Sequence, residues 1–368
     1  MARKLASVVE IESCEPIPET DRLSVAKMVG KGWQVVVGRD EFKKGDLCVY
    51  FEIGSYLDAR DRRFAFLKDQ CFRKIVSKSG TVLREGHRIE TISRGGVISQ
   101  GLLMPVDAFL EIEDPEVGDD VTLLLKVESF NEVSEQLCPA TGAARSGDAM
   151  CPFPAMIPMT GEEPLQNLGD WFQTMKGSEW QVTQKHDGMS CTIAYSPTID
   201  HKNPVIVCSR NQRLKSVSET GIVSIYWQMA MKYKIVEKLK RLYDDSDGYV
   251  ELALQGEIVG HGINGNRNRE NEYKFLMFRA WRIQEQRFYQ PEHLIQLCDY
   301  WGIPHVNVVK DRFRFFDEIT TMEDALKFAE GKTPEGNERE GLVCKSVDRN
   351  PLISFKLVSN KYLLNGEA

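Results

Sequence analysis

The sequence predicts an α+β protein of two parts, a small antiparallel β-barrel followed by a larger mixed α+β domain. Short β-rich runs separated by turn residues fill positions 1–127, without long helical periodicity. After position 152, strand patterns alternate with segments of helical period. A chain of 368 residues can form two domains of ordinary size, each with its own core.

The first part is predicted to hold several short strands. The clearest lie at 24–29, 34–38, 47–52 and 101–104. Turn signals such as Gly30-Lys31-Gly32 and Lys44-Gly45-Asp46 separate them. Many short strands with such punctuation are typical of a small barrel, and an OB-fold is the natural candidate. We therefore expect an OB-like domain over 1–127.

A linker is predicted over 128–152. Regular patterning fades there into Pro-Ala-Thr-Gly-Ala-Ala-Arg-Ser-Gly-Asp-Ala, a composition typical of a flexible segment. The second domain is then expected over 153–368. Its strands are predicted near Lys185 and at 205–208, 252–259, 274–281, 341–346 and 353–357, and its helices at 164–176, 218–243, 291–301 and 322–330.

Composition is that of a soluble globular protein, with 42% hydrophobic and 27% charged residues. No apolar run approaches the ~20 residues of a membrane span, and the N-terminus lacks the apolar core of a secretory signal. The nine cysteines include no Cys-x-x-Cys pair, so neither a disulfide framework nor a zinc ribbon is indicated. We expect an intracellular protein, cytoplasmic by default, with no membrane partner, and a monomer.

The net charge of −7 conceals a basic segment. Between Arg60 and Arg94 there are ten Lys or Arg and four acids, interleaved with phenylalanines. One interpretation is a solvated basic surface over core phenylalanines. The other is a patch that follows phosphates, since neutralised phosphates supply most of the non-specific affinity for nucleic acid.

The most informative motif is Gln184-Lys185-His186-Asp187-Gly188, between predicted strands at 180–183 and 190–194. A motif this short occurs by chance in many proteins. The signal comes from the order of further residues along the chain: Ser209-Arg210, Glu257, Phe278, Glu340-Gly341-Leu342-Val343-Cys344-Lys345, Lys356 and Lys361.

This ordered series resembles the covalent nucleotidyltransferases, the superfamily of polynucleotide ligases and mRNA capping enzymes. The OB-like domain at the front is similar to that of one group, the RNA ligases with an N-terminal OB domain. DNA ligases and capping enzymes normally carry an OB domain after the last lysine. Here seven residues come after Lys361, so we expect none.

Lysine is a suitable nucleophile toward a nucleotide α-phosphate, because its amine forms a phosphoramidate that a later nucleophile displaces. Its ordinary pKa of ~10.4 is the obstacle. The site must favour the neutral amine by burial or by nearby cations, for which Lys345 and Lys356 are candidates. A divalent cation held by carboxylates would assist the transfer.

By resemblance, the cofactors are ATP and Mg²⁺ (or Mn²⁺), and Phe278 stacks on the purine. The implied catalytic residues are Lys185, Glu257, Lys345 and Lys356. The implied nucleotide-binding residues are Gln184, Asp187, Gly188, Arg210, Phe278, Glu340 and Lys361. The implied metal ligands are Asp187, Glu257 and Glu340.

The resemblance implies an ATP-dependent RNA ligase that seals 3′-OH/5′-phosphate nicks, in RNA repair. The lysine takes AMP from ATP, AMP passes to the RNA 5′-phosphate, and the 3′-hydroxyl displaces it. The expected partner is nicked duplex RNA or an RNA/DNA hybrid. Two alternatives stay open: a GTP-dependent capping-type guanylyltransferase, and a non-catalytic RNA-binding protein on the same fold.

Three positions depart from the family pattern. Pro164 stands where an arginine is common ahead of the lysine. Arg279 follows Phe278 where an acid is common, and Val358 stands where a second lysine often follows Lys356. These departures concern nucleotide contacts and rate more than the class of reaction.

Overall fold

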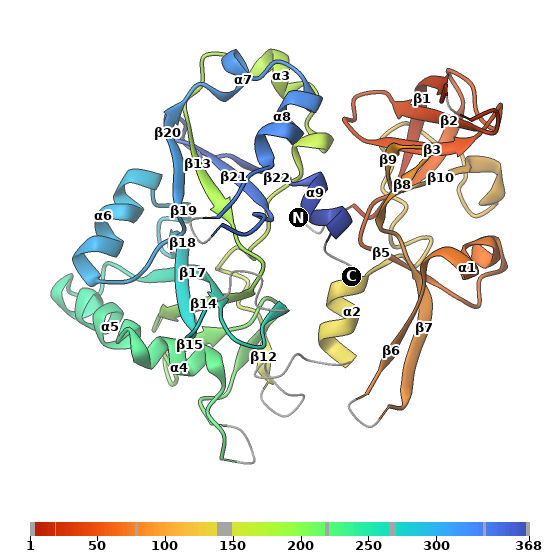
Figure 1. The fold of residues 1–368 in the computed structure, drawn as a ribbon. Coiled ribbons are helices and arrows are strands. Elements are labelled where there is room, and N and C mark those ends of the chain that lie inside the picture. Colours follow the sequence, from red (N-terminus) through yellow and green to blue (C-terminus); the bar gives the residue numbers. More distant parts are fainter. Residues whose placement is uncertain are drawn as a thin grey trace. The chain divides into compact units, whose positions relative to one another are not determined.

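The computed structural model describes residues 4–18, 20–77, 80–137, 149–217, 221–264, 270–333 and 336–365. Its backbone divides into two units (Figure 1). Unit 1 consists of Met1–Cys138, Leu165–Asp170 and Leu363–Ala368. Unit 2 consists of Pro139–Pro164 and Trp171–Tyr362.

A five-stranded antiparallel sheet forms one layer of unit 1, in the order β10-β4-β1-β2-β3. Its strands are β1 (Ala6–Pro16), β2 (Leu23–Met28), β3 (Gln34–Gly38), β4 (Leu47–Phe51) and β10 (Leu102–Pro105). The first half of β1 pairs with β4 and the second half with β2, with an irregularity between Ile11 and Ser13. Such a bulge bends a strand and lets the sheet curl, as a small barrel requires.

A four-stranded sheet, β11-β5-β7-β6, and a β8-β9 hairpin complete the strands described in unit 1. They are β5 (Ser55–Asp58), β6 (Phe72–Val76), β7 (Val82–Arg88), β8 (Thr91–Arg94), β9 (Val97–Gln100) and β11 (Glu128–Ser129). Short helices connect them: η1 (Arg62–Leu67), α1 (Lys68–Cys71), η2 (Val106–Ala108) and α2 (Phe130–Leu137). The core between these elements includes the buried Val8, Phe51, Leu57, Phe64 and Phe109.

The predicted linker over 128–152 contains regular structure at both ends. Residues 128–137 form β11 and α2, where Tyr56 packs edge-on against Phe130. Residues 149–152 form β12 (Ala149–Pro152). The glycine- and alanine-rich middle, 138–148, lies outside the described residues.

Unit 2 contains two antiparallel sheets. The larger has the order β12-β16-β15-β14-β17-β18-β19 and the smaller the order β20-β13-β21-β22. Besides β12, the larger sheet contains β14 (Met189–Tyr195), β15 (Val205–Cys208), β16 (Gln212–Leu214), β17 (Leu252–Val259), β18 (Lys274–Arg282) and β19 (Arg287–Phe288). The smaller contains β13 (Trp180–Lys185), β20 (Val308–Phe313), β21 (Gly341–Ser346) and β22 (Ser354–Val358).

Three helices cover one face of the larger sheet: α4 (Ile225–Lys232), α5 (Ile235–Asp245) and α6 (Pro291–Trp301) (Figure 1). The single helix predicted over 218–243 is wrong, because Lys234 adopts a left-handed conformation (φ 51°) between α4 and α5. Its apolar stripe is correct, since Met229 and Leu239 are buried against that sheet.

The smaller sheet carries α3 (Trp171–Thr174), α7 (Phe315–Glu318), α8 (Met322–Ala329) and α9 (Asn360–Asn365) nearby (Figure 1). The helix predicted over 164–176 is replaced by η3 (Leu165–Asn167) and α3. At Gly169, between η3 and α3, a Cβ would lie 3.0 Å from the Gly30 carbonyl oxygen, so the backbone passes close to that oxygen. In unit 1, Asn167 accepts from the Trp33 indole at 2.6 Å.

Candidate active site

The motif lysine lies at the C-terminal end of β13. Lys185 pairs across the ladder with Gly341, the first residue of β21. A Cβ at Gly341 would stand 2.0 Å from the Leu357 carbonyl oxygen, so only glycine lets β22 approach this end of β21. The residue before it, Glu340, is thereby brought directly to Lys185.

Lys185 Nζ forms an ion pair and a hydrogen bond with Glu340 Oε1. The Lys185 side chain is 26% exposed and that of Glu340 is 13% exposed. Burial lowers the pKa of Lys185, but the carboxylates of Glu340, Glu257 and Asp187 together outweigh burial, so the pKa lies above its ordinary value. The expectation that burial and nearby cations depress the Lys185 pKa therefore does not hold for the free protein.

Glu257 lies in β17, and its charge acts on the same lysine. A Cβ at Gly188 would lie 2.8 Å from Glu257 Cγ and 2.4 Å from the Ile258 oxygen, so glycine permits the motif to approach β17. Burial raises the pKa of Glu257 to about 8; Lys185 opposes this rise, and Glu340 and Asp187 add to it. Burial also raises the pKa of Glu340. The Glu340 charge disfavours ionisation of Glu257, and a bound cation would relieve that repulsion.

No group of three metal-binding side chains is assembled among residues that the structure describes. The predicted trio of Asp187, Glu257 and Glu340 therefore does not form a ready-made cage. Buried Glu340 Oε2 nevertheless lacks a hydrogen-bond partner among the described atoms. Mg²⁺ in proteins is usually held by one or two carboxylates together with substrate phosphates and water, and Glu257 and Glu340 fit that mode.

Lys345 belongs to a second buried group. Its side chain is 4% exposed, its Nζ donates to the Phe278 carbonyl oxygen, and Nζ lies 5.4 Å from the centre of the Phe278 ring. Burial lowers the Lys345 pKa to about 7, and the nearby Arg279 guanidinium contributes in the same direction. Lys345 and Phe278, predicted from separate motifs, are therefore neighbours.

Arg279 forms an ion pair with Glu162, and Ser354 Oγ donates to the other carboxylate oxygen. Arg279 is 7% exposed. Burial would raise the pKa of Glu162, but Arg279, Lys345 and the Ser354 hydrogen bond together outweigh burial, so the pKa lies below the usual value. Arg279, at a position where an acid is common in the family, thus has an acidic partner in Glu162, two residues before Pro164.

The remaining predicted residues lie on strands and loops of the same unit as Lys185 and Lys345. Lys356 in β22 lies opposite Val343, donates its backbone N–H to the Glu163 oxygen at 2.9 Å, and its charge acts on Glu340. The Arg210 charge acts on Glu257. Gln184 is buried within β13.

Lys361 forms an ion pair in this structure. Its side chain is 60% exposed and pairs with Glu330 at 2.7 Å. The next residue, Tyr362, instead donates its hydroxyl to Asp187 Oδ2. The sequence signal for Tyr362 is weak, since nothing but its position after Lys361 associates it with the motif.

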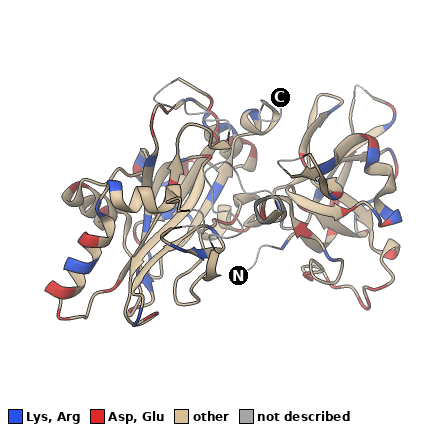
Figure 2. Cartoon of the chain, turned by 90° about the horizontal axis from the view of Figure 1, so that it is seen from below, with Lys and Arg blue, Asp and Glu red and all other residues tan. Residues whose placement is uncertain are grey.

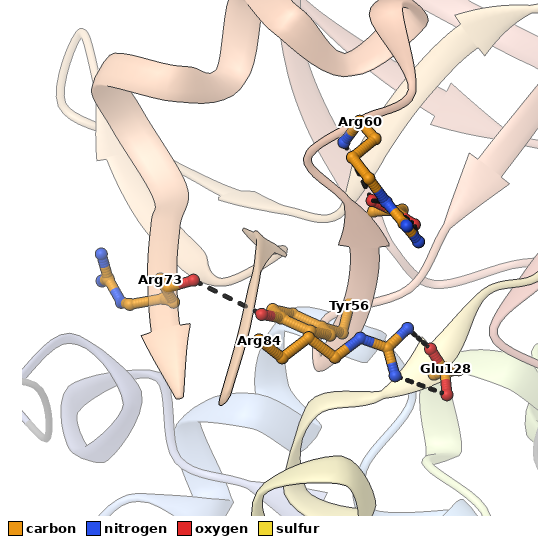
Figure 3. Close-up of polar contacts among 6 residues, drawn as sticks. Tyr56, Arg60, Arg73, Arg84 and Glu128 are labelled. Carbon is orange, nitrogen blue, oxygen red and sulfur yellow. Dashed lines mark hydrogen bonds and ion pairs between the residues drawn. The ribbon is translucent and has the colours of Figure 1, made fainter. Parts of the chain in front are cut away.

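The basic segment of unit 1 is largely neutralised. Its ion pairs are Arg60–Asp58, Arg63–Asp61, Arg63–Glu111, Arg73–Glu90, Lys74–Glu85, Arg84–Glu128 and Arg88–Glu90. Figure 3 shows Arg84 bound to Glu128 while Tyr56 donates to the Arg73 carbonyl oxygen. Figure 2 shows Asp and Glu positions interspersed with Lys and Arg positions along the chain. In the described part of this segment, Arg62 and Lys68 are the exposed cations without a carboxylate partner.

Comparisons with known proteins agree with this architecture. An RNA ligase family model matches residues 178–363, and an OB-fold domain model matches residues 5–106. No curated protein matches the chain. The matches confirm the predicted fold class, an OB-like N-terminal domain followed by a mixed α+β nucleotidyltransferase domain.

Solved structures of a Naegleria gruberi RNA ligase are similar over nearly the whole chain. The structure with PPi is 32% identical, with a TM-score of 0.81, and 98% of each chain is covered. A lysine-to-alanine variant with ATP and Mn is 31% identical, with a TM-score of 0.83, covering 99% of this chain and 98% of that one. A lysine-to-methionine variant with AMP and Mn is 31% identical, with a TM-score of 0.82 and 98% of each chain covered.

Proposed function

This chain belongs to the RNA ligase family, and on that premise we propose that it seals 3′-OH/5′-phosphate nicks in duplex RNA with ATP, as an RNA-repair enzyme. The observation that carries the proposal is the contact of Lys185 Nζ with Glu340, two groups whose charges both act on Glu257. The related Naegleria ligase has been solved with ATP, AMP and Mn, and its substituted residues include a lysine and an aspartate two positions apart, the spacing of Lys185 and Asp187.

In the first step, the neutral Lys185 amine attacks the α-phosphorus of ATP. A P–N bond forms, the P–O bond to pyrophosphate breaks, and pyrophosphate leaves. Glu340 Oε1 already accepts a hydrogen bond from Nζ, so it is placed to take the proton that the amine must lose. Glu257 and Glu340 are the residues that would hold a divalent cation, which would supply neutralisation of charge on the nucleotide.

The next two steps transfer the nucleotide. An oxygen of the RNA 5′-phosphate attacks the AMP phosphorus, the P–N bond breaks, and the lysine amine leaves and is reprotonated. The RNA 3′-hydroxyl then attacks the 5′-phosphorus and gives its proton to water, a phosphodiester forms, and AMP departs with the bond electrons. Lys345 and Lys356 would bind the phosphates during these steps, since positioning and charge neutralisation dominate phosphoryl transfer.

A sealing assay tests the proposal. We expect ATP to support joining of a nick whose 3′-OH strand is RNA, on an RNA and on a DNA template, while an all-DNA nick is joined poorly. Equal joining of the all-DNA nick would contradict an RNA ligase. GMP transfer to an RNA end from GTP, without sealing, would instead favour the capping-type enzyme.

We further propose that Arg62 and Lys68 contact substrate phosphates. Because they lack carboxylate partners among described residues, they can release counterions without breaking an ion pair. Reversing both charges should weaken binding to nicked RNA and reduce the magnitude of its log–log salt slope by about 2. Arg241→Glu, at an 82% exposed position on α5, is the matched control. Unchanged binding and slope would show that the basic segment is a solvated surface.

A further inference from the structure

The motif aspartate is held from two sides by residues distant in the sequence. Tyr362 Oη donates to Asp187 Oδ2, and Asn264 Nδ2 donates to Asp187 Oδ1 at 2.8 Å. Asn264 Nδ2 also donates to the Gly188 oxygen at 2.9 Å. Both carboxylate oxygens of Asp187 therefore have a donor that limits side-chain rotation.

The backbone before α9 fixes where Tyr362 lies. Ser359 is fully buried and donates its N–H to the Glu340 oxygen at 2.8 Å. Its Oγ accepts from the Tyr362 N–H at 3.2 Å. The first turn of α9 is thus attached to the backbone of the residue that pairs with Lys185.

Lys361, the residue before Tyr362, forms an ion pair with Glu330. Glu330 is the residue that follows α8. The consecutive side chains of Lys361 and Tyr362 therefore have different partners, Glu330 and Asp187. The hydroxyl of Tyr362 is the only difference between Tyr and Phe, and it is the group that donates to Asp187. Removing it leaves the ring and the helix in place.

We propose that Tyr362 is a positioning residue for lysyl-AMP formation, acting through the Asp187 carboxylate. This inference rests on the proposed ligase function. Asp187 stands two residues after Lys185, and its charge acts on Lys185, Glu257 and Glu340. A hydrogen bond to an ionised carboxylate is directional, so the tyrosine hydroxyl sets the orientation from which Asp187 meets the nucleotide.

Single-turnover adenylylation of Tyr362→Phe tests the inference. Intact protein, ATP and Mg²⁺ are mixed, and the adduct is followed by mass. We expect the rate at saturating ATP to fall by about 10- to 100-fold, the loss that corresponds to one charge-assisted hydrogen bond. The KM for ATP and the thermal midpoint should stay at wild-type values. Tyr300→Phe, 85% exposed on α6, is the matched control and should change nothing.

Each other outcome overturns the inference. A rate within twofold of wild type would show that the hydroxyl is dispensable. A raised KM with an unchanged saturating rate would assign Tyr362 to nucleotide binding, and a slow variant with a lowered thermal midpoint would assign it a packing role. If the wild-type protein itself forms no adduct, the proposed ligase chemistry fails, and the positioning role fails with it.

Discussion

Lys185→Ala should lose lysyl-AMP formation by about 10⁴-fold or more, the loss expected when a covalent nucleophile is removed. The alanine has no amine to attack the α-phosphorus, and Glu340 loses the partner of its buried carboxylate. The measurement is adduct formation and RNA sealing with ATP. Lys240→Ala, an exposed lysine on α5, is the matched control.

A bypass substrate separates lost chemistry from lost folding. RNA whose 5′ end already carries AMP needs no lysine nucleophile, because the remaining step is displacement of AMP by the 3′-hydroxyl. The Lys185→Ala protein should therefore still join this RNA. If folded Lys185→Ala protein joins neither ordinary RNA with ATP nor RNA that already carries AMP, Lys185 does more than form the covalent bond. If the variant still seals ordinary RNA with ATP, Lys185 is not the nucleophile.

Arg279→Met should cause the largest loss of stability among the site variants. Glu162 would stay buried without its guanidinium partner, which lowers the free energy of unfolding by about 3 kcal/mol. Lys345 limits the loss at neutral pH: removing the neighbouring cation raises the Lys345 pKa, so more of its amine is charged beside Glu162. As pH rises through that raised pKa, this compensation disappears and the destabilisation should grow.

Urea denaturation at pH 7 and pH 9 measures this effect. Arg241→Met removes the ion pair of an 82% exposed arginine with Asp245 and should change the free energy of unfolding by no more than about 0.5 kcal/mol. Adding Glu162→Gln to Arg279→Met should restore much of the loss, because no buried charge remains. An Arg279→Met protein as stable as wild type at both pH values would contradict the account of this pair.

Local patterning predicted most of the strands around the site. The motif segments coincide with β13, β14, β17, β18, β21 and β22 to within a residue or two, since each is a short apolar run with clear boundaries. The antiparallel order of these strands brings Lys185, Glu257 and Glu340 together. Glycines at 188 and 341 permit the close approaches, and both belong to the predicted motifs.

Interactions between distant segments were not predictable in this way. Tyr362 and Asp187 are 175 positions apart, and Arg279 and Glu162 are 117 apart, so no local period associates them. Lys361 was expected at the nucleotide because of residue type and order. In the structure its side chain pairs with Glu330, the residue that follows α8.

The charge of the basic segment illustrates the same limit. Counting within 60–94 finds an excess of cations, but Asp58, Glu111 and Glu128 lie outside that window and pair with its arginines. A linear count cannot include acids that the fold brings from elsewhere. The structure therefore reduces the candidate phosphate contacts in the described segment to a few positions.

Intact mass after incubation with Mg²⁺ and either ATP or GTP tests the central claim most directly, for the wild-type protein and for Lys185→Ala. The account predicts that the wild-type protein gains one AMP from ATP alone and that the variant gains nothing. A GMP adduct from GTP would contradict it in favour of capping chemistry. No adduct with either nucleotide, from protein shown to be free of AMP beforehand, would contradict it in favour of a non-catalytic RNA-binding protein.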